Sequence, residues 1–348
     1  MARSGGDEFV VLLTAGAPSP EDLVAEVFGA PFDLAAGPVR LPRTVRVSAG
    51  WTPVTRSSRL SHALADVDVA LYAAKGAGKG TVTAFAPGLR EDVLGRLALV
   101  EDLRRLLDGE PGAGRLEPRY QPLVSLDDHA GDHVVGCEAL VRWAHPERGL
   151  LTPDVFLGLA EEHGLGARLD AWMLRAALDQ LARWDAEGLP RLFLSVNLGC
   201  ASMTDPGLLT AVQDALRASG IAPARLHLEI TEHDELPAGA GAGALQALAA
   251  TGVRVSLDDF GVGYTSLDYV RLYPVTTLKL DRSITAPLQD EETSPLLRGV
   301  VLLARSVGMD VLAEGIETPA QRRRLVDLGI DLGPVSYTHL TLPTNREV

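Results

Sequence analysis

The chain has little cysteine. Only Cys137 and Cys200 occur in its 348 residues. They lack the spacing of a metal-ligand pair, which predicts a reducing compartment without structural disulfides. No apolar run approaches the roughly 18 residues that a membrane span needs. The first eight residues are glycine-rich and partly acidic, unlike a secretory signal peptide. Together these absences predict a cytoplasmic protein with no membrane segment.

Positive charge is also scarce. Lysine and arginine number 32 against 46 aspartate and glutamate residues, so the net charge is −14. That balance excludes a general binder of DNA, RNA or anionic membranes, which would need a basic surface. A phosphorylated ligand stays possible if metal ions supply the positive charge. The remaining composition, 46% hydrophobic and 22% charged, is typical of globular proteins, and the length allows two domains.

The residues before Leu116 predict a hairpin near the start of the chain and a helix before the second region. Gly5-Gly6-Asp7-Glu8 precedes the apolar run 9–13, which predicts a hairpin turn leading into a buried strand. Leucine and valine recur at helical spacing through residues 88–109, which predicts a connecting helix that ends near Gly109. We expect residues 88–114 to be this helix and a short linker.

From Leu116 onward, short strands alternate with amphipathic helices. Seven strand candidates are 119–124, 134–142, 192–197, 226–230, 254–257, 277–280 and 310–313. Helices are expected after Thr152-Pro153, over residues 170–187, and from Thr318-Pro319 to before Gly329. This alternation predicts a parallel sheet closed into a TIM-like (β/α) barrel. Seven strands are one fewer than eight, so the last strand is expected to be missing.

Polar residues recur where these strands end. The set comprises Glu138, Asn197, Glu229, Glu232, Asp258, Asp259, Lys279, Asp281, Glu314 and Glu317. Buried carboxylates are costly unless they are paired or bind metal. In α/β barrels the carboxyl ends of the strands form the active site. Oxygen ligands with one amide suit Mg²⁺ or Mn²⁺ better than zinc.

The stretch Val253–Tyr264 is the most informative of these strand ends. A β-branched run ends in Asp258-Asp259 and continues into a loop with Gly261 and Gly263. A lone Asp-Asp pair is more typical of a solvated acidic turn. Two adjacent carboxylates repel each other unless cations lie nearby. Adjacent side chains of an extended segment point to opposite sides, so the two aspartates could serve different partners.

Residues 115–333 resemble an EAL domain, the family of cyclic di-GMP phosphodiesterases. The matching motifs are Tyr120-Gln-Pro122, Glu138-Ala-Leu140 with Arg142, Asn197-Leu198, Glu229-Ile-Thr-Glu232, Asp258–Tyr264, Leu278-Lys-Leu-Asp281 and Ala313-Glu-Gly-Ile-Glu317. Residues 1–87 resemble the second half of a GGDEF (diguanylate cyclase) domain, on Gly5–Phe9, Val47–Gly50 and Ala65–Lys75. The resemblance implies a truncated GGDEF domain before an EAL barrel that hydrolyses a bacterial second messenger to linear pGpG.

The resemblance also implies roles for single residues. Two metal ions, Mg²⁺ or Mn²⁺, would be held by Glu138, Asn197, Glu229, Asp258 and Asp259. The catalytic set would be Lys279, Glu314, Asp259 and Glu232, with Glu232 supporting the loop after Asp259. Gln121, Arg142 and Asp281 would contact the substrate, and Asp281 would also help at the second metal. Lys279 could orient the attacking water or act as its base.

The end of the chain departs from the family pattern, and the function and assembly leave alternatives open. Residues 334–348 lack the family's closing glutamine motif and are expected to be a non-native tail. An incompletely folded fragment is one alternative to the enzyme, because the eighth strand is expected to be missing. A second alternative is an inactive cyclic di-GMP receptor, although receptors of this kind usually lose the metal ligands that this chain keeps. Cyclase activity is a weaker alternative. Tyr264, Tyr269 and Tyr273 form a plausible patch for a homodimer, or else pack on the barrel.

Overall fold

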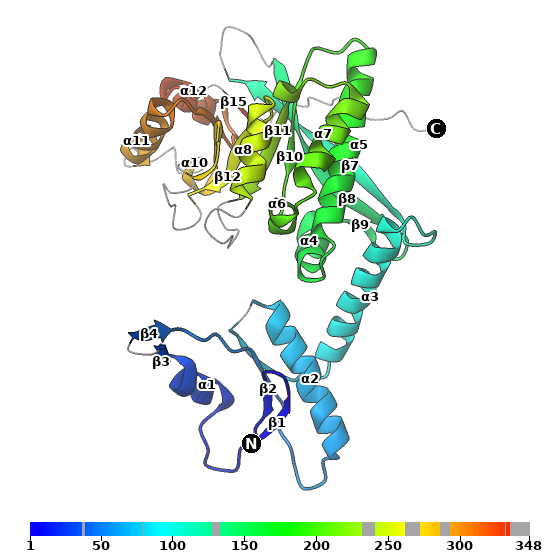
Figure 1. Ribbon diagram of the computed structural model, residues 1–348, viewed down its shortest axis with the longest axis vertical. Helices are drawn as coiled ribbons and strands as arrows, with labels where there is room; N and C mark the ends of the chain where they lie inside the picture. The colour runs from blue at the N-terminus through cyan, green and yellow to red at the C-terminus, as the bar shows by residue number, and fades with distance from the viewer. Residues whose placement is uncertain are drawn as a thin grey trace. The chain divides into compact units, whose positions relative to one another are not determined.

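The computed structural model describes residues 1–36, 39–78, 80–126, 133–231, 241–261, 272–285, 293–330 and 332–334 (Figure 1). The chain separates into two compact units, Met1–Leu99 and Val100–Val348. The helix predicted between the domains is α3, Leu89–Leu107, and it contains the boundary between the units. Gly109 follows it with a positive φ of 77°, a conformation that glycine adopts at little cost.

The first unit begins with the predicted hairpin. Strands β1 (Ala2–Gly5) and β2 (Glu8–Val10) pair antiparallel around Gly6, whose φ is 52°. The prediction that the following apolar run is buried is wrong, since Phe9 is 57% exposed and Leu12 71%. The two-stranded ribbon pairs with no third strand among the described residues, so its apolar side chains remain in water.

The rest of the first unit is two helices and two further strand pairs. These elements are α1 Pro20–Phe28, β3 Phe32–Ala36, β4 Val39–Arg43, β5 Ala49–Trp51, α2 Leu60–Gly76 and β6 Val82–Ala84. Strands β3 and β4 are antiparallel, and β5 and β6 are parallel. Helix α2 packs on β5, burying Ala70 and Ala74, and a Cβ on Gly50 would collide with its backbone.

The second unit forms the predicted barrel, which eight strands close. They are β7 Arg115–Ser125, β8 Val134–His145, β10 Phe193–Asn197, β11 Leu226–Thr231, β12 Arg254–Phe260, β13 Thr277–Leu280, β14 Asp310–Ala313 and β15 Leu332–Pro334. They follow one another in the order β10 to β15, then β7 and β8, and β8 pairs with β10 to complete the circle. A short strand β9, Gly149–Leu151, extends β8 outside the barrel.

Two details of the predicted barrel were wrong. The eighth strand is present as β15, which pairs with β14 at Leu332 and with β7 over Leu332–Pro334. Three residues that include glycine and proline carry no strand periodicity, and Pro334 had been assigned to the tail. The sheet is also not wholly parallel, because β7 runs antiparallel to both neighbours. The remaining predicted tail, 335–348, lies outside the described residues.

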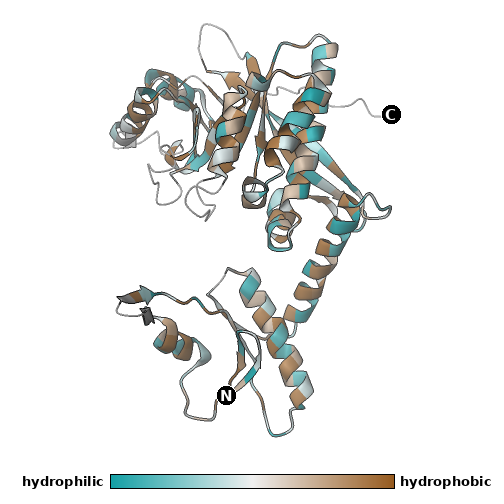
Figure 2. Cartoon of the chain, in the orientation of Figure 1, coloured by the Kyte–Doolittle hydropathy of each residue, from teal (hydrophilic) through white to brown (hydrophobic). Residues whose placement is uncertain are grey.

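Helices of the second unit follow the barrel strands. They are α4 Pro153–Glu162, α5 Gly166–Ala186, α6 Cys200–Thr204, α7 Leu208–Ser219, the 3₁₀ turn η1 Pro223–Arg225, α8 Ala242–Ala250, α10 Arg282–Thr285, α11 Thr293–Ser306 and α12 Pro319–Asp327. The predicted starts of α4 and α12 are confirmed, and Thr318 and Gln321 cap α12 reciprocally. Figure 2 shows hydrophobic residues along the barrel strands and mixed polarity along α5, which buries one face.

Candidate metal centre

Acidic residues from three barrel strands and the acid that follows β14 surround one lysine. Glu138 is on β8, Glu229 on β11, Asp258 on β12, Lys279 on β13, and Glu314 follows β14. The strand register explains the convergence, because it pairs Asn197 with Glu229 and Thr231 with Asp258. Inward-facing positions of neighbouring strands therefore lie at similar heights near the carboxyl ends of the parallel strands.

Lys279 lies at the centre of this cluster. Its Nζ is 2.8 Å from Glu229 Oε2, 2.9 Å from Asp258 Oδ2, 3.1 Å from Glu314 Oε1 and 3.4 Å from Glu138 Oε2. The lysine side chain is only 1% exposed. One ammonium among four carboxylates leaves an excess of negative charge if all four are ionised. An additional cation would lower that electrostatic cost.

The pKa values of the cluster reflect this excess. Burial opposes charge on Lys279, but the surrounding carboxylates outweigh it and raise the lysine pKa well above its ordinary value. Burial raises the pKa of Glu229 well above its ordinary value, although Lys279 works against the shift. Burial likewise raises the pKa of Glu314 to about 7. The ionised forms of Glu229 and Glu314 are thus disfavoured in the metal-free protein, and a bound metal ion would stabilise them.

A metal ion fits the donor set. Oxygen atoms of Glu138, Glu229 and Asp258 lie within 4.8 Å of one another, and all three residues are buried. Glu229 Oε1 is buried without a hydrogen-bond partner, so one carboxylate lone pair in the cluster is available. The Asn197 amide nitrogen donates to Glu138 Oε1 at 3.0 Å, which leaves its carbonyl oxygen as the possible ligand atom. Carboxylate and amide oxygens are the ligands of hard divalent cations.

The backbone changes direction between the two adjacent aspartates. Strand β12 has a register shift between Leu257 and Phe260. Asp259 has a φ of 54°, the one positive value for a residue other than glycine in the described part of the chain. Its N–H donates to Asp258 Oδ1 at 2.9 Å. The predicted extended geometry at this pair is therefore wrong. Asp258 is buried in the cluster, and the half-buried Asp259 follows the turn.

The other predicted site residues lie on or next to barrel strands. Gln121 is directly opposite Glu138 on β7 and is half-buried. Arg142 is half-buried on β8, and its Nη1 donates to the carbonyl of Val141. Asp281 follows β13 and accepts a hydrogen bond from the Ser283 N–H at 2.7 Å. Burial alone would raise the Asp281 pKa, but the hydrogen bonds from Ser283 and Arg282 lower it overall.

Two sequence predictions, Glu232 and the tyrosine patch, and the cysteine Cys137 need separate comment. Glu232 lies outside the described residues, as do Tyr264 and Tyr269. Tyr273 is buried, with 5% of its surface exposed. Cys137 is fully buried, and burial raises its pKa to about 12, which suits a core residue rather than a nucleophile.

Sequence reasoning missed two acids that hold the loop after Asn197. Asp170 Oδ2 accepts hydrogen bonds from the Gly199 N–H at 2.8 Å and the Ser202 hydroxyl at 2.6 Å. Glu161 Oε2 accepts from the Ala201 N–H at 3.3 Å. Gly199 was the available signal, because a Cβ there would lie 2.1 Å from Glu161 Oε1. Without that signal, Asp170 and Glu161 are indistinguishable in the sequence from solvated acids on a helix surface.

Comparison with known proteins connects this geometry to a family. A family profile described as EAL domain matches residues 100–333. The bifunctional diguanylate cyclase/cyclic di-GMP phosphodiesterase MucR of Pseudomonas aeruginosa is 34% identical over 336 residues, covering 94% of this chain and 47% of MucR. The cyclic di-GMP phosphodiesterase NbdA of the same organism is 34% identical over 338 residues, covering 92% of this chain and 40% of NbdA.

A solved structure agrees with the fold of the second unit. The PaMucR phosphodiesterase in complex with c-di-GMP has a TM-score of 0.61 and 36% identity, covering 68% of this chain and 94% of that one. The chain spans about half the length of MucR and less of NbdA. In the part of the chain that the structure describes, no helix is both long and apolar enough to cross a membrane.

Proposed function

We propose that this chain, which belongs to the EAL domain family, hydrolyses cyclic di-GMP to linear pGpG with Mg²⁺ or Mn²⁺. The buried cluster of Glu138, Glu229 and Asp258, with one unpartnered carboxylate oxygen on Glu229, is the observation that most supports this proposal. The similar proteins named as cyclic di-GMP phosphodiesterases identify the substrate class.

The proposed metal ligands are residues of the cluster and its immediate neighbours in the sequence. Glu138, Asn197, Glu229 and Asp258 would hold a first ion, and Asp259 would serve a second with help from Asp281 and Glu314. When bound, such ions lower the pKa of a coordinated water and stabilise negative charge on the attacked phosphodiester. The separation of Asp258 from Asp259 by the turn at φ 54° would let the two carboxylates serve different ions.

Lys279 and Arg142 are assigned to orientation and binding. Every acidic partner of Lys279 described above stabilises its ammonium form, which favours a donor that orients the attacking water over a base that removes its proton. Gln121, opposite Glu138 on β7, and Arg142, four residues after Glu138 on β8, would contact the ligand. A planar guanidinium can bind two phosphate oxygens at once.

Product analysis of the complete chain tests this function. We expect chromatography to show conversion of cyclic di-GMP to pGpG with Mg²⁺ or Mn²⁺, and no conversion after chelation. Ca²⁺ should substitute poorly, because its coordination is larger and more flexible. Binding of cyclic di-GMP without turnover under the activating conditions would contradict the proposal and support a receptor.

We further propose that residues 1–87 are a partial GGDEF unit without cyclase activity, in a cytoplasmic protein. The hairpin at Gly5–Glu8 and the relative named as bifunctional support the assignment. Formation of cyclic di-GMP from GTP and Mg²⁺ by this chain would contradict it.

A homodimer through the region 264–273 is also a proposal. Tyr273 is buried, which weakens the aromatic patch as its basis. Light scattering at high micromolar concentration should give the mass of a dimer, and the mass of one chain would count against pairing.

A further inference from the structure

The interior of the barrel beneath the metal centre is lined by small polar side chains. Ser195, His227, Ser256 and Thr277 each lie two residues before a cluster residue, namely Asn197, Glu229, Asp258 and Lys279. Alternate residues of a barrel strand face the interior, so the four form the next layer down. Bulky branched residues usually fill such layers in α/β barrels. Two serines and a threonine leave this layer underfilled.

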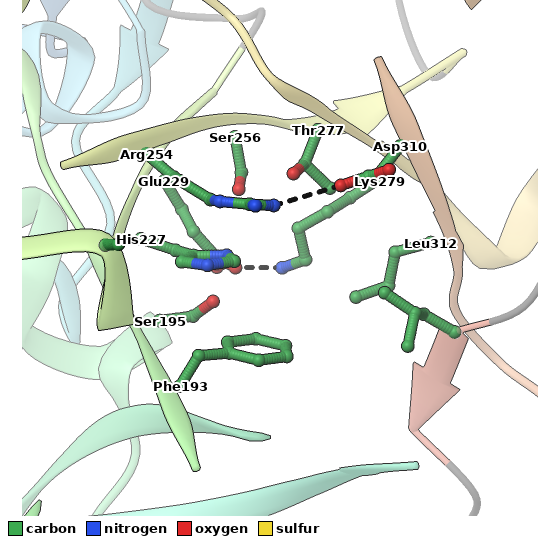
Figure 3. A pocket seen from close by; sticks show the side chains of 12 residues that line it. Phe193, Ser195, His227, Glu229, Arg254, Ser256, Thr277, Lys279, Asp310 and Leu312 are labelled. Carbon is green, nitrogen blue, oxygen red and sulfur yellow. Dashed lines mark hydrogen bonds and ion pairs between the residues drawn. The ribbon is translucent and has the colours of Figure 1, made fainter. Parts of the chain in front are cut away.

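A cavity of about 200 Å³ occupies this space. Glu229 and Lys279 line its inner end, next to the metal centre. Phe193, Arg254 and Asp310, each the first residue of its strand, line the opposite end, which faces the amino ends of the parallel strands (Figure 3). The cavity is therefore separate from the mouth of the barrel where the strands end in carboxylates.

Two buried polar atoms among the lining residues lack partners. Thr277 Oγ1 and Glu229 Oε1 are both buried without a hydrogen bond, and the two residues are 4% and 1% exposed. Figure 3 shows the Thr277 hydroxyl on the side of the cavity. Buried hydroxyls normally have a hydrogen-bond partner, so we expect a molecule bound in the cavity to form a hydrogen bond with Thr277 Oγ1.

The lining disfavours an anionic occupant. The carboxylates around Lys279 at the inner end repel anions. At the outer end Arg254 is paired with Asp310 and adds no net charge. His227 stacks on Phe193 with ring centroids 4.3 Å apart, and its imidazole nitrogens add hydrogen-bonding atoms to this wall.

The lining also favours one molecule with a carbon skeleton over water alone. The volume would hold several water molecules, and each ordered water needs two to four polar partners. Hydroxyls of Ser195, Ser256 and Thr277 occupy part of the wall, but Ala224, Leu312 and Leu332 make the rest apolar. A small polyol satisfies both kinds of wall, with its carbons against the leucines and its hydroxyls toward the polar layer.

The outer end of the cavity can open. Arg254 and Asp310 form an ion pair of 3.0 Å across it, with 45% and 59% of their side chains exposed. Exposed ion pairs of this kind contribute little to stability and exchange readily with water.

We propose that this cavity is a binding site for a small neutral polyol of about the size of glycerol, entered from the amino ends of the barrel strands between Arg254 and Asp310. The proposal does not depend on the hydrolysis, although Glu229 and Lys279 of the candidate metal centre line the inner end of the cavity. The site would be filled from the side of the barrel opposite the nucleotide.

Crystallography of the complete chain gives the direct test. Crystals grown without polyol should show water in the cavity, and crystals soaked in glycerol should show glycerol within hydrogen-bond distance of Thr277 Oγ1. Water in both crystals, or an empty cavity in both, would overturn the proposal. Glycerol with no contact to Thr277 or Ser256 would be an adventitious additive only and would also overturn it.

Thermal unfolding with two variants provides the solution test. Ser256→Leu fills the cavity, and Thr277→Val removes the hydroxyl at nearly constant volume. Glycerol should raise the wild-type Tm with a saturable component on top of the general osmolyte effect. That component should vanish in Ser256→Leu and saturate at about tenfold higher glycerol in Thr277→Val. Equal responses in wild type and Thr277→Val would contradict the site even if Ser256→Leu does not fold.

Discussion

Two glutamate–lysine pairs in this chain have nearly the same geometry and different surroundings. Glu8 and Lys75 approach to 3.1 Å in the first unit with more than half of each side chain exposed. Glu229 and Lys279 approach to 2.8 Å in the barrel with 1% of each side chain exposed. Both glutamates belong to short acidic motifs at strand ends. The comparison shows that burial, together with neighbouring acids, distinguishes a candidate metal centre from a solvated turn.

The largest difference between the two regions should appear in turnover. Asp258→Ala removes a carboxylate that lies within 4.8 Å of Glu138 and Glu229, and we expect turnover to fall by at least about 10³-fold. Asp7→Ala, a matched change in the exposed hairpin, should leave turnover unchanged. Product chromatography for both variants measures the contrast, and equal losses would refute it.

The second largest difference should be the loss of unfolding free energy when each lysine is replaced. Lys279→Met in chelated protein leaves four neighbouring carboxylates without their cation and should cost about 3–5 kcal/mol of unfolding free energy. Lys75→Met should cost less than about 1 kcal/mol. Urea denaturation measures both changes. Mg²⁺ should recover part of the Lys279→Met loss, and similar costs for the two variants would contradict the buried cluster.

Asp259→Asn should have an intermediate effect. Asparagine tolerates the left-handed backbone of this position, so the φ of 54° can persist while the charge is lost. We expect kcat to fall by at least about 10²-fold while cyclic di-GMP binding changes little. Parallel measurement of turnover and binding checks this. Equal turnover by the variant and the wild type would remove Asp259 from the mechanism.

The smallest effect should be a pH dependence of stability in the metal-free protein. Burial raises the Glu314 pKa from 4.5 to about 7 and shifts that of Glu229 in the same direction. The folded chain then binds more protons than the unfolded chain between those pH values. Stability from Glu314 is therefore complete below pH 4.5 and is lost as the pH rises through about 7, and Glu229 contributes with the same sign.

The slope should reach at most about 1.4 kcal/mol per pH unit for each proton. Urea denaturation from pH 5 to pH 8 measures it, with Glu314→Gln as the control that should reduce the slope. Mg²⁺ should also reduce it, because the ion competes with protons for the same oxygens. A slope that neither change reduces would exclude these carboxylates as its origin.

Much of the barrel was predictable because strand alternation and inward-facing acids follow fixed periods. From the sequence alone, that reasoning placed Glu138, Glu229 and Asp258 together. It could not predict the turn at Asp259, since a single left-handed residue leaves no periodic signal. It could not show that Lys279 lies among four carboxylates, which depends on the register of several strands. It failed at β15 and at the exposed run after Glu8, where pairing partners rather than local sequence decide the outcome.

The closing strand β15 has a consequence for the order of folding. It joins β14 to β7, and Arg322 on the preceding helix donates to the carbonyls of Leu126 and Ser125, which lie 196 and 197 residues earlier. Contacts of such long separation form slowly because the loop-closure entropy must be overcome first. During synthesis, β7 and β14 would remain unpaired edges until residues 332–334 leave the ribosome. Chaperone dependence should therefore be concentrated in the last stage of translation of this unit.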